Sequence, residues 1–404
     1  MEIEMEDWKK QLYICWLVMF IHMSGMAMIL PFLPLYIREL GVSDPKALSV
    51  WSGIIFGVSF LVSGALSPMW GNLSDKYGRK AIILRSTFGI CVVCALMSSV
   101  TNIYQLLFLR IMHGFFGGVV QAFIALASEK IPKEKTGQGL GILQTSMIMG
   151  GVLGPLIGGV LADHLGYRTV LFIISLLTFL AGLLTIFFLT ESKKLKTVKT
   201  TISDNIKLVL ASKHLMTITV IQFVIQFSLM LVQPILPLFI QALYRSTNVG
   251  TLIGIVFAIT GLATMLFTPI WGKIGDKKGH RKILSQSLLI MSIVYLPQAL
   301  VMSVWQLIPV RVIVGIFAAG IVPAINTIIV KNTPETRRGG VLGIINSFSL
   351  FGTALGPMIG GSMAAVFGIR FSFVVTALIL FLTWYFSRNV FNESDRPGGL
   401  LQNE

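Results

Sequence analysis

The sequence predicts an all-α membrane protein with twelve transmembrane helices arranged as two six-helix bundles. Three observations predict this fold class. Only 12% of the 404 residues are charged and 54% are hydrophobic, whereas an average soluble chain has about 25% charged residues. Apolar runs of about 20 residues, each long enough to cross a bilayer core of about 30 Å, follow one another along the chain. Sequence landmarks of the first half recur in the second half at a nearly constant offset.

The apolar runs place the twelve spans in order. The composition excludes a disordered chain, a collagen-like repeat and a small disulfide-stabilised scaffold. Each run is bounded by polar or charged residues, so we read the span boundaries at the change in hydropathy. The predicted spans are residues 12–37, 48–70, 82–101, 104–127, 139–162, 168–190, 214–243, 250–271, 283–303, 305–330, 340–366 and 369–388.

The distribution of Lys and Arg predicts the orientation of these spans. Of the 32 basic residues, 25 fall in segments that are cytoplasmic if both termini are cytoplasmic. Cytoplasmic loops carry an excess of Lys and Arg, so we expect a multi-pass protein of the cell (inner) membrane with cytoplasmic tails at 1–11 and 389–404. The net charge of +15 is then an insertion signal, and we expect no nucleic-acid partner. The outer segments hold Arg38, Lys46, Arg168, Arg245 and Arg370.

The chain contains an internal repeat. Trp70-Gly71-x-x-x-Asp75-x-x-Gly78 recurs as Trp271-Gly272-x-x-x-Asp276-x-x-Gly279. Because each half holds six spans, an even number, the halves insert in the same orientation and are related by a pseudo-two-fold axis along the membrane normal. The predicted units are a bundle at 12–190, a basic cytoplasmic linker at 191–213 and a bundle at 214–388. Further matching pairs are Arg110-x-x-x-Gly114 with Arg311-x-x-x-Gly315, Gly154-Pro155 with Gly356-Pro357, and Pro31-x-x-Pro34 with Pro234-x-x-Pro237.

Several motifs resemble those of a known family. Residues 71–80, which read Gly-Asn-Leu-Ser-Asp-Lys-Tyr-Gly-Arg-Lys, resemble the signature between spans 2 and 3 of the major facilitator superfamily. Residues 150–159 on span 5 resemble the signature of its drug–proton antiporters. Residues 30–36 and 51–54 resemble the MdtG/PmrA-like multidrug-efflux branch. The resemblance covers essentially the whole chain and implies the two-bundle fold and transport by alternating access.

The loop between spans 2 and 3 carries a candidate cytoplasmic latch, which comprises Gly71, Asp75, Gly78, Arg79 and Lys80. A carboxylate there can accept charge-assisted hydrogen bonds from arginine or meet a helix N-terminus. Such a cluster can hold the halves together on the cytoplasmic side until the transporter opens inward. The alternative is a solvated loop that serves only the positive-inside rule. The second copy retains Asp276, but His280 replaces the arginine, which predicts a weaker latch.

The span 5 motif comprises Gly150, Gly154, Pro155, Gly158 and Gly159. Small residues four positions apart let helices pack closely in lipid, and proline favours a bend. Close packing would seal the protein against leaks while its halves rock; a simple packing face is the alternative. The glycines are not a nucleotide fingerprint, because they lie in a span with no preceding strand. No GxxxxGK[ST] sequence occurs, so the energy for transport must come from an ion or solute gradient.

Four residues within the spans are candidates for charge and proton coupling: His22, Arg110, His113 and Arg311. An intramembrane arginine is costly and functional by default; the alternative is a structural tie to backbone carbonyls. All 17 acids lie near one membrane face or the other, whereas many drug–proton antiporters carry a carboxylate at mid-membrane. We therefore expect coupling through the two histidines, whose unperturbed pKa of about 6.5 suits a proton carrier. Hydrogen-bonded packing residues are the alternative for both.

The resemblance also implies a substrate cavity, because spans 1, 4, 7 and 10 line the central cavity in this superfamily. Amides among Met and Phe side chains suit a deformable, largely apolar site for varied amphiphiles. Hydrogen bonding between helices is the alternative for each amide. The candidate cavity residues are Met26, Gln121, Gln222, Phe223, Gln226, Met230, Gln233 and Asn326.

These features favour an exporter of drugs or other amphiphilic toxic compounds that works in exchange for protons. An importer or facilitator of a small metabolite or sugar is the alternative, and a transporter-like sensor is a second one. The short tails disfavour a sensor, and the spans hold no nucleophile or acid–base cluster of the kind an enzyme needs. We expect small amphiphilic substrates, protons and the lipid bilayer as partners, no cofactor or metal, and a monomer.

Overall fold

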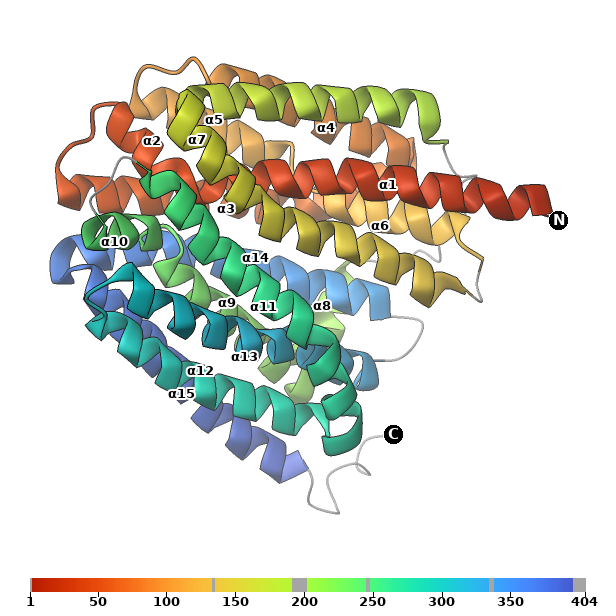
Figure 1. Cartoon of the computed structure of the whole chain (residues 1–404). Coiled ribbons are helices and arrows are strands. Elements are labelled where there is room, and N and C mark those ends of the chain that lie inside the picture. Colours follow the sequence, from red (N-terminus) through yellow and green to blue (C-terminus); the bar gives the residue numbers. More distant parts are fainter. Residues whose placement is uncertain (1, 133–134, 191–201, 245–247, 334–337, 395–404) are drawn as a thin grey trace.

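The computed structural model describes residues 2–132, 135–190, 202–244, 248–333 and 338–394, and every regular element in these ranges is a helix. Figure 1 shows the helices of the first half (red to yellow) stacked on those of the second half (green to blue). The first half comprises α1 (Glu2–Ile29), the 3-10 turn η1 (Leu30–Phe32), α2 (Leu33–Glu39), α3 (Pro45–Tyr77), α4 (Arg79–Met97), α5 (Ile103–Phe115), α6 (Val119–Lys130) and α7 (Thr136–Phe188). The second half comprises α8 (Ile202–Ala211), α9 (Lys213–Val232), α10 (Leu236–Leu243), α11 (Val249–Lys278), α12 (His280–Leu300), α13 (Val304–Lys331), α14 (Arg338–Phe367) and α15 (Ile369–Ser394).

Eleven helical segments among the described residues are long and apolar enough to cross a membrane, and one of them has double length. The segment Gly137–Phe188 has 52 residues, which is about 78 Å at 1.5 Å per residue and more than twice a bilayer core. Gly166 interrupts this segment with φ 78° and ψ 160°, a conformation that a residue without Cβ adopts readily. α7 therefore contains two spans, and the described residues form the twelve spans that the sequence predicts.

Two spans are interrupted by matching prolines. α1 gives way to η1, which contains Pro31, and α2 begins directly afterwards. In the second half α9 ends at Val232, and α10 begins at Leu236 with Pro237 in its first turn. Proline lacks an N–H and suits the first turn of a helix. The repeated Pro-x-x-Pro pattern therefore explains why both spans break at equivalent positions.

The two ends of the molecule differ in how closely the halves pack. α1 begins at the right of Figure 1, and α15 runs from the left toward the lower right. We call the right-hand end the inner end, because the Lys and Arg distribution predicts it to be cytoplasmic. Toward the opposite, outer end, α3 packs on α14 and α7 packs on α11. A Cβ at Gly53 of α3 would clash with the backbone of Pro357, and one at Gly159 of α7 would clash with that of Gly250. Glycine is therefore required where the halves touch.

α8 lies within the predicted linker 191–213, of which residues 191–201 lie outside the described part of the chain. The helix packs against α9 and α14. Its Val209 is buried in the hydrophobic core of the second half. The last part of the linker is thus a helix docked on the second bundle, which the lysine-rich composition of this segment did not predict.

Candidate functional site

A central cavity of about 280 Å³ lies among α1, α3, α4, α5, α6 and α7. Four of the residues proposed from the sequence line it: His22 and Met26 of α1, His113 of α5 and Gln121 of α6. Of the residues that line this cavity, Leu350 of α14 is the one that comes from the second half. The structure therefore brings together the candidates from spans 1 and 4 around a single space in the first half.

The candidates on span 7 lie elsewhere, because they face α14. Gln222 donates from Nε2 to Ser349 Oγ at 3.3 Å. Gln226 lies against Gly352 of α14, and Met230 lies against Gly356 of α14. This arrangement matches the alternative in which the amides join helices. Among the remaining candidates, Phe223 lines a separate apolar cavity, Gln233 is half-buried and Asn326 is exposed.

The two histidines of the central cavity differ in their hydrogen bonding. The Thr87 hydroxyl donates to the Ile83 carbonyl at 2.8 Å, so at 2.9 Å it accepts a hydrogen bond from His22 Nε2. This assigns the proton of neutral His22 to Nε2. His113 is half-buried, lines the same cavity and makes no hydrogen bond to the described residues. His22 is therefore tied to α4, whereas His113 is available to whatever enters the cavity.

The two intramembrane arginines are bound inside their own halves. Arg110 is 1% exposed and donates to two carbonyls of α3, from Nε to Ile55 O at 3.0 Å and from Nη2 to Phe56 O at 3.4 Å. Arg311 of α13 is also buried and lies near Tyr295 of α12, and its Nε has no hydrogen-bond partner among the described residues. The contacts of Arg110 match the predicted alternative of a structural tie to backbone carbonyls. Arg311 makes no such hydrogen bond to the described residues.

Two further cavities adjoin the central one. An inner cavity of about 380 Å³ lies between α3, α4 and α6 on one side and α14 on the other. It shares Ser67, Gly118 and Gln121 with the central cavity. An apolar cavity of about 400 Å³ lies among α3, α8, α9 and α14 and shares Pro68 and Ser347 with the inner cavity. The three cavities therefore form a series of neighbours that share wall residues.

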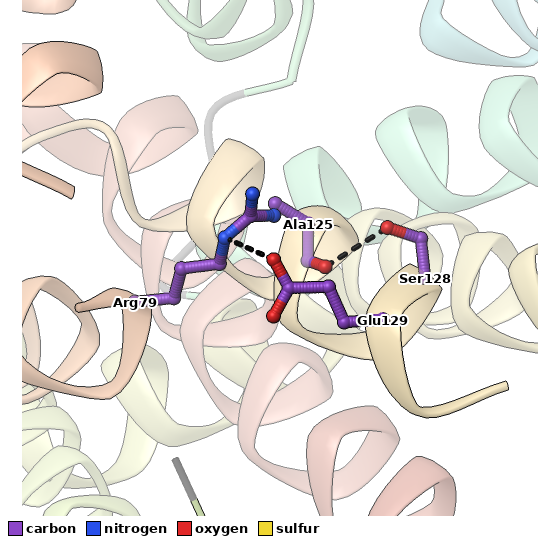
Figure 2. Close-up of polar contacts among 4 residues, drawn as sticks. All are labelled: Arg79, Ala125, Ser128 and Glu129. Atoms are coloured by element: carbon purple, nitrogen blue, oxygen red, sulfur yellow. Dashed lines mark hydrogen bonds and ion pairs between the residues drawn. The ribbon is translucent and has the colours of Figure 1, made fainter. Parts of the chain in front are cut away.

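The candidate latch makes its described ion pair within the first half. Figure 2 shows the guanidinium of Arg79, at the start of α4, facing the carboxylate of Glu129 near the end of α6. Arg79 Nε lies 2.8 Å from Glu129 Oε1, and both side chains are largely buried. The side chain of Asp75 lies outside the described residues. The sequence reasoning missed Glu129; the signal that could have found it is an acid at the inner end of span 4 whose counterpart in the second half is Val330.

The other latch residues have local roles. Gly78 joins α3 to α4 with φ 98°, a backbone conformation that favours glycine. The Lys80 ammonium donates to the Ile186 carbonyl at 2.9 Å, and a Cβ at Gly71 would meet no atom within 4 Å. In the second half, Asp276 Oδ1 lies 3.0 Å from His280 Nε2, with the Asp276 side chain 76% exposed.

The span 5 motif is a packing face with two partners. A Cβ added at Gly150, Gly154 or Gly158 would clash with α1, whereas one at Gly159 would clash with α11. The carbonyl of Pro155 lies where a Cβ on Gly254 of α11 would project. The motif thus joins spans within the first half and also forms part of the contact between the halves.

Polar contacts close the outer end between the halves. The Asp163 carboxylate of α7 accepts hydrogen bonds from the backbone N–H of Gly250 at 2.9 Å and of Thr251 at 2.6 Å, in the first turn of α11. Arg38 Nη1 of α2 donates to Gln241 Oε1 of α10 at 2.6 Å. We call these contacts the outer gate. They join residues far apart in the chain, so sequence patterns did not reveal them.

Comparison with known proteins gives the family. The sequence profile of the Major Facilitator Superfamily matches residues 15–247 and 218–400, which together span nearly the whole chain. The chain belongs to the major facilitator superfamily. This member of the superfamily is similar to the multidrug resistance protein MdtG of Dickeya zeae (strain Ech586), with 38% identity over 384 residues that cover 94% of each chain. It is also similar to MdtG of Salmonella schwarzengrund (strain CVM19633), with 36% identity over 392 residues that cover 95% of this chain and 96% of the relative.

Solved structures agree with the superfamily fold. A bacterial homologue of the human lysosomal transporter Spinster, in an inward-facing and occupied conformation, has a TM-score of 0.80 at 16% identity and covers 94% of this chain and 96% of its own. The human organic anion transporter MFSD10 (TETRAN) has a TM-score of 0.70 at 15% identity, with coverages of 94% and 99%. As a member of the major facilitator superfamily, the chain is a multi-pass membrane transporter.

Proposed function

We propose that the chain is a secondary active transporter that exports drugs or other amphiphilic compounds across the cytoplasmic membrane, by alternating access and in exchange for protons. The observation that carries this proposal is the 36–38% identity to MdtG multidrug resistance proteins over at least 94% of the chain. A fold alone hosts many activities, so the cavities must also suit the cargo. We further propose that both termini are cytoplasmic, as the Lys and Arg distribution indicates, and that the transporter acts as a monomer.

The placement of contacts suits a state that is open toward the cytoplasm. At the outer end the halves are joined by the outer gate, in which Asp163 and Arg38 reach across. At the inner end a cavity separates Arg79 of α4 from Gly343 of α14, which line its opposite sides. An exporter must collect its substrate from the cytoplasmic side while its outer end is closed. This is the arrangement expected of the loading state.

The chemistry of the three cavities suits an amphiphile. The apolar cavity is lined by side chains such as Leu210, Phe223 and Phe348, next to α8. The adjoining inner cavity offers Asn72 and Arg79, and the central cavity offers histidines and Gln121. Apolar walls with a few polar groups are typical of small-molecule sites. A substrate with an apolar body and a polar or cationic group can enter along this series and lose little favourable hydration at any step.

Proton exchange is assigned to His113. Its imidazole faces the central cavity without a protein hydrogen bond to the described residues, and Arg110 lies one turn earlier on the same helix. A proton on His113 and a cationic substrate would compete for one low-dielectric space, because like charges repel strongly there. Release of the proton inward would therefore favour substrate loading, and release of substrate outward would favour protonation.

The test is transport by the purified full chain in liposomes with an imposed pH gradient and a panel of dyes. Ethidium is a suitable probe, because it is a permanent cation whose passive distribution does not follow pH. We expect ethidium to accumulate in the more acidic compartment, against its own gradient, and a protonophore to abolish the accumulation. A facilitator would only equilibrate the dye, and a sensor would not move it. Either result, with protein-free liposomes as the control, would contradict coupled export.

A further inference from the structure

Span 4 is broken at a place where its repeat partner in the second half is continuous. α5 ends at Phe115 and α6 begins at Val119, so three residues interrupt the span. The equivalent span of the second half is the single helix α13. No proline marks the break in span 4, in contrast to the breaks in spans 1 and 7. The difference between the halves therefore needs another physical cause.

One cause is a pair of glycines. Gly117 and Gly118 of the first half correspond in the repeat to Ala318 and Ala319 of the second. Gly118 adopts φ 90° and ψ 2°, the left-handed conformation that a Cβ makes costly. Alanine is the best helix former, so the second half continues as a helix where the first half turns.

The second cause is Arg85 of α4, which clamps the break. Its Nη1 donates to Phe115 O at 3.2 Å, and its Nη2 donates to Gly117 O at 2.8 Å. These are carbonyls at the C-terminal end of α5, where the helix dipole favours a cation. The guanidinium carbon lies 3.3 Å from the centre of the Trp70 ring, a stacking geometry that arginine favours on aromatic faces.

In the second half, a different side chain binds the carbonyl at the equivalent position. The counterpart of Arg85 is the exposed Gln286, and the counterpart of Trp70 is Trp271. The Trp271 indole N–H itself donates to the carbonyl of Ile316 at 2.7 Å, and Ile316 corresponds to Phe115. Equivalent carbonyls are thus held by an arginine on a tryptophan in one half and by the tryptophan directly in the other. The comparison links Arg85 to the break rather than to general packing.

The break lies on the substrate path. Gly118 and Gln121 line both the central and the inner cavity, and Gly117 lines the central one. If span 4 were a continuous helix, the residues after the break would be rotated and shifted relative to His113. The break therefore sets how Gln121 faces the cavities.

We propose that Arg85 is a positioning residue for transport: with Trp70 it holds span 4 open at Gly117–Gly118, so that Gln121 projects into the series of cavities. This assignment rests on the proposed export function for its role, but the geometry of the break can be measured without transport. Arg85 acts through the backbone of span 4 and does not line the cavities described above.

The test combines labelling with transport kinetics in the full chain. Cys15, Cys91 and Cys94 are replaced by alanine, Gln121→Cys is introduced, and a membrane-impermeant maleimide is applied to inside-out vesicles. Gly118→Ala is expected to change the labelling rate about tenfold, because a residue with a Cβ populates the left-handed conformation about that much less. Arg85→Gln removes the other support of the break and is expected to change the rate by a similar factor. In chains that retain Gln121, both changes are expected to raise the KM for ethidium more than they lower the maximal rate. Arg85→Lys keeps the charge but loses the planar fork and is expected to give an intermediate result.

The matched control is Gln286→Ala, which removes the repeat counterpart and is expected to leave labelling and KM within about twofold. Gly118→Ala decides the question if Arg85→Gln does not reach the membrane, because a Cβ at Gly118 meets only ordinary contacts with Trp70. Unchanged labelling and KM in both variants would overturn the proposal. Altered labelling in a chain that transports no dye at all would support the clamp and count against the export function instead.

Discussion

At the residue scale, hydrogen-bond partners separate side chains that the sequence treats alike. His22 and His113 both lie in spans and line one cavity. His22 donates a hydrogen bond to the Thr87 hydroxyl, which donates to the Ile83 carbonyl. His113 faces the cavity. The protonation of a histidine that already has a protein hydrogen-bond partner responds less to a change in the cavity contents than that of a histidine without one. We therefore propose His113, rather than His22, as the coupling group.

We expect His113→Gln to reduce ethidium accumulation driven by a pH gradient to the level of protein-free liposomes. His22→Gln should retain most of the activity, because the glutamine amide can still donate to Thr87. The exposed His164 provides the matched control, and His164→Gln should transport normally. Full gradient-driven transport by the variant that combines His22→Gln with His113→Gln would exclude the histidine mechanism and direct attention to carboxylates such as Asp163 and Glu129.

The Arg79–Glu129 pair makes a second prediction at this scale. The side chains are 18% and 10% exposed, so removal of one partner leaves a poorly solvated charge. We expect Arg79→Gln and Glu129→Gln each to lower the unfolding temperature, with a coupling free energy of about 0.5–3 kcal/mol in the double-mutant cycle. Asp276→Asn is the control in the second half and should have little effect, because that carboxylate is 76% exposed. If the two substitutions had strictly additive effects on the free energy of unfolding, the ion pair would contribute nothing to stability.

At the scale of elements, helix ends determine how the halves meet. The N-terminal turn of α11 is held by the Asp163 carboxylate at the outer end of span 5. A carboxylate at a helix N-terminus satisfies free N–H groups and the positive end of the dipole. Gly159 of the span 5 motif and Gly254 of α11 let the two helices approach closely enough for this contact. The C-terminal part of the motif and the outer gate therefore belong to one contact between α7 and α11.

We expect Asp163→Ala to weaken the closed outer end. Loss of a helix cap costs about 0.5–2 kcal/mol, which corresponds to a shift of roughly two- to thirty-fold toward the outward-open state. Spin labels on α7 and α11 near the outer end should report a larger population of long distances in Asp163→Ala than in the control Asp44→Ala. Asp44 is also an outer helix cap, but its carboxylate caps its own helix α3 at Ala47. Identical distance distributions in the two variants would show that Asp163 does not stabilise the gate.

At the scale of the whole molecule, two bundles share a contact that must form and break. The central cavity lies almost entirely within the first half, and the second half supplies α14 as the facing wall of the inner cavity. The halves therefore differ in structure around the cavities although they repeat in sequence. The break in span 4 and the pairing of Arg79 with Glu129 are both features of the first half alone.

We predict that the halves fold and insert separately. A chain divided between Leu195 and Thr200 should yield two fragments that reassemble when co-expressed, because the contacts of α3 with α14 and of α7 with α11 do not depend on the linker. The cut leaves α8 with the second fragment, on which it packs. Co-purification of the fragments and recovery of ethidium transport are the measurements. Inserted fragments that fail to bind one another would contradict the division at the linker.

The sequence alone determined the class of the protein, the number and approximate limits of its spans, the repeat and the superfamily. These follow from hydropathy, charge and motif spacing, which are properties of neighbouring residues along the chain. It also identified His22, Met26, His113 and Gln121 as residues near a cavity, because spans 1 and 4 were assigned that position by resemblance.

Only the tertiary structure decided which way each helix faces and which distant groups it meets. Gln222 and Gln226 have the helical spacing of a cavity face, yet α9 is rotated so that they meet α14. Glu129 as the partner of Arg79 and the first turn of α11 as the partner of Asp163 are likewise contacts between segments far apart in the chain. The rotation of a helix in a membrane is set by close packing against neighbouring helices, since lipid is as apolar as the side chains that face it. Hydropathy therefore places a span in the bilayer, and packing alone determines its inward face.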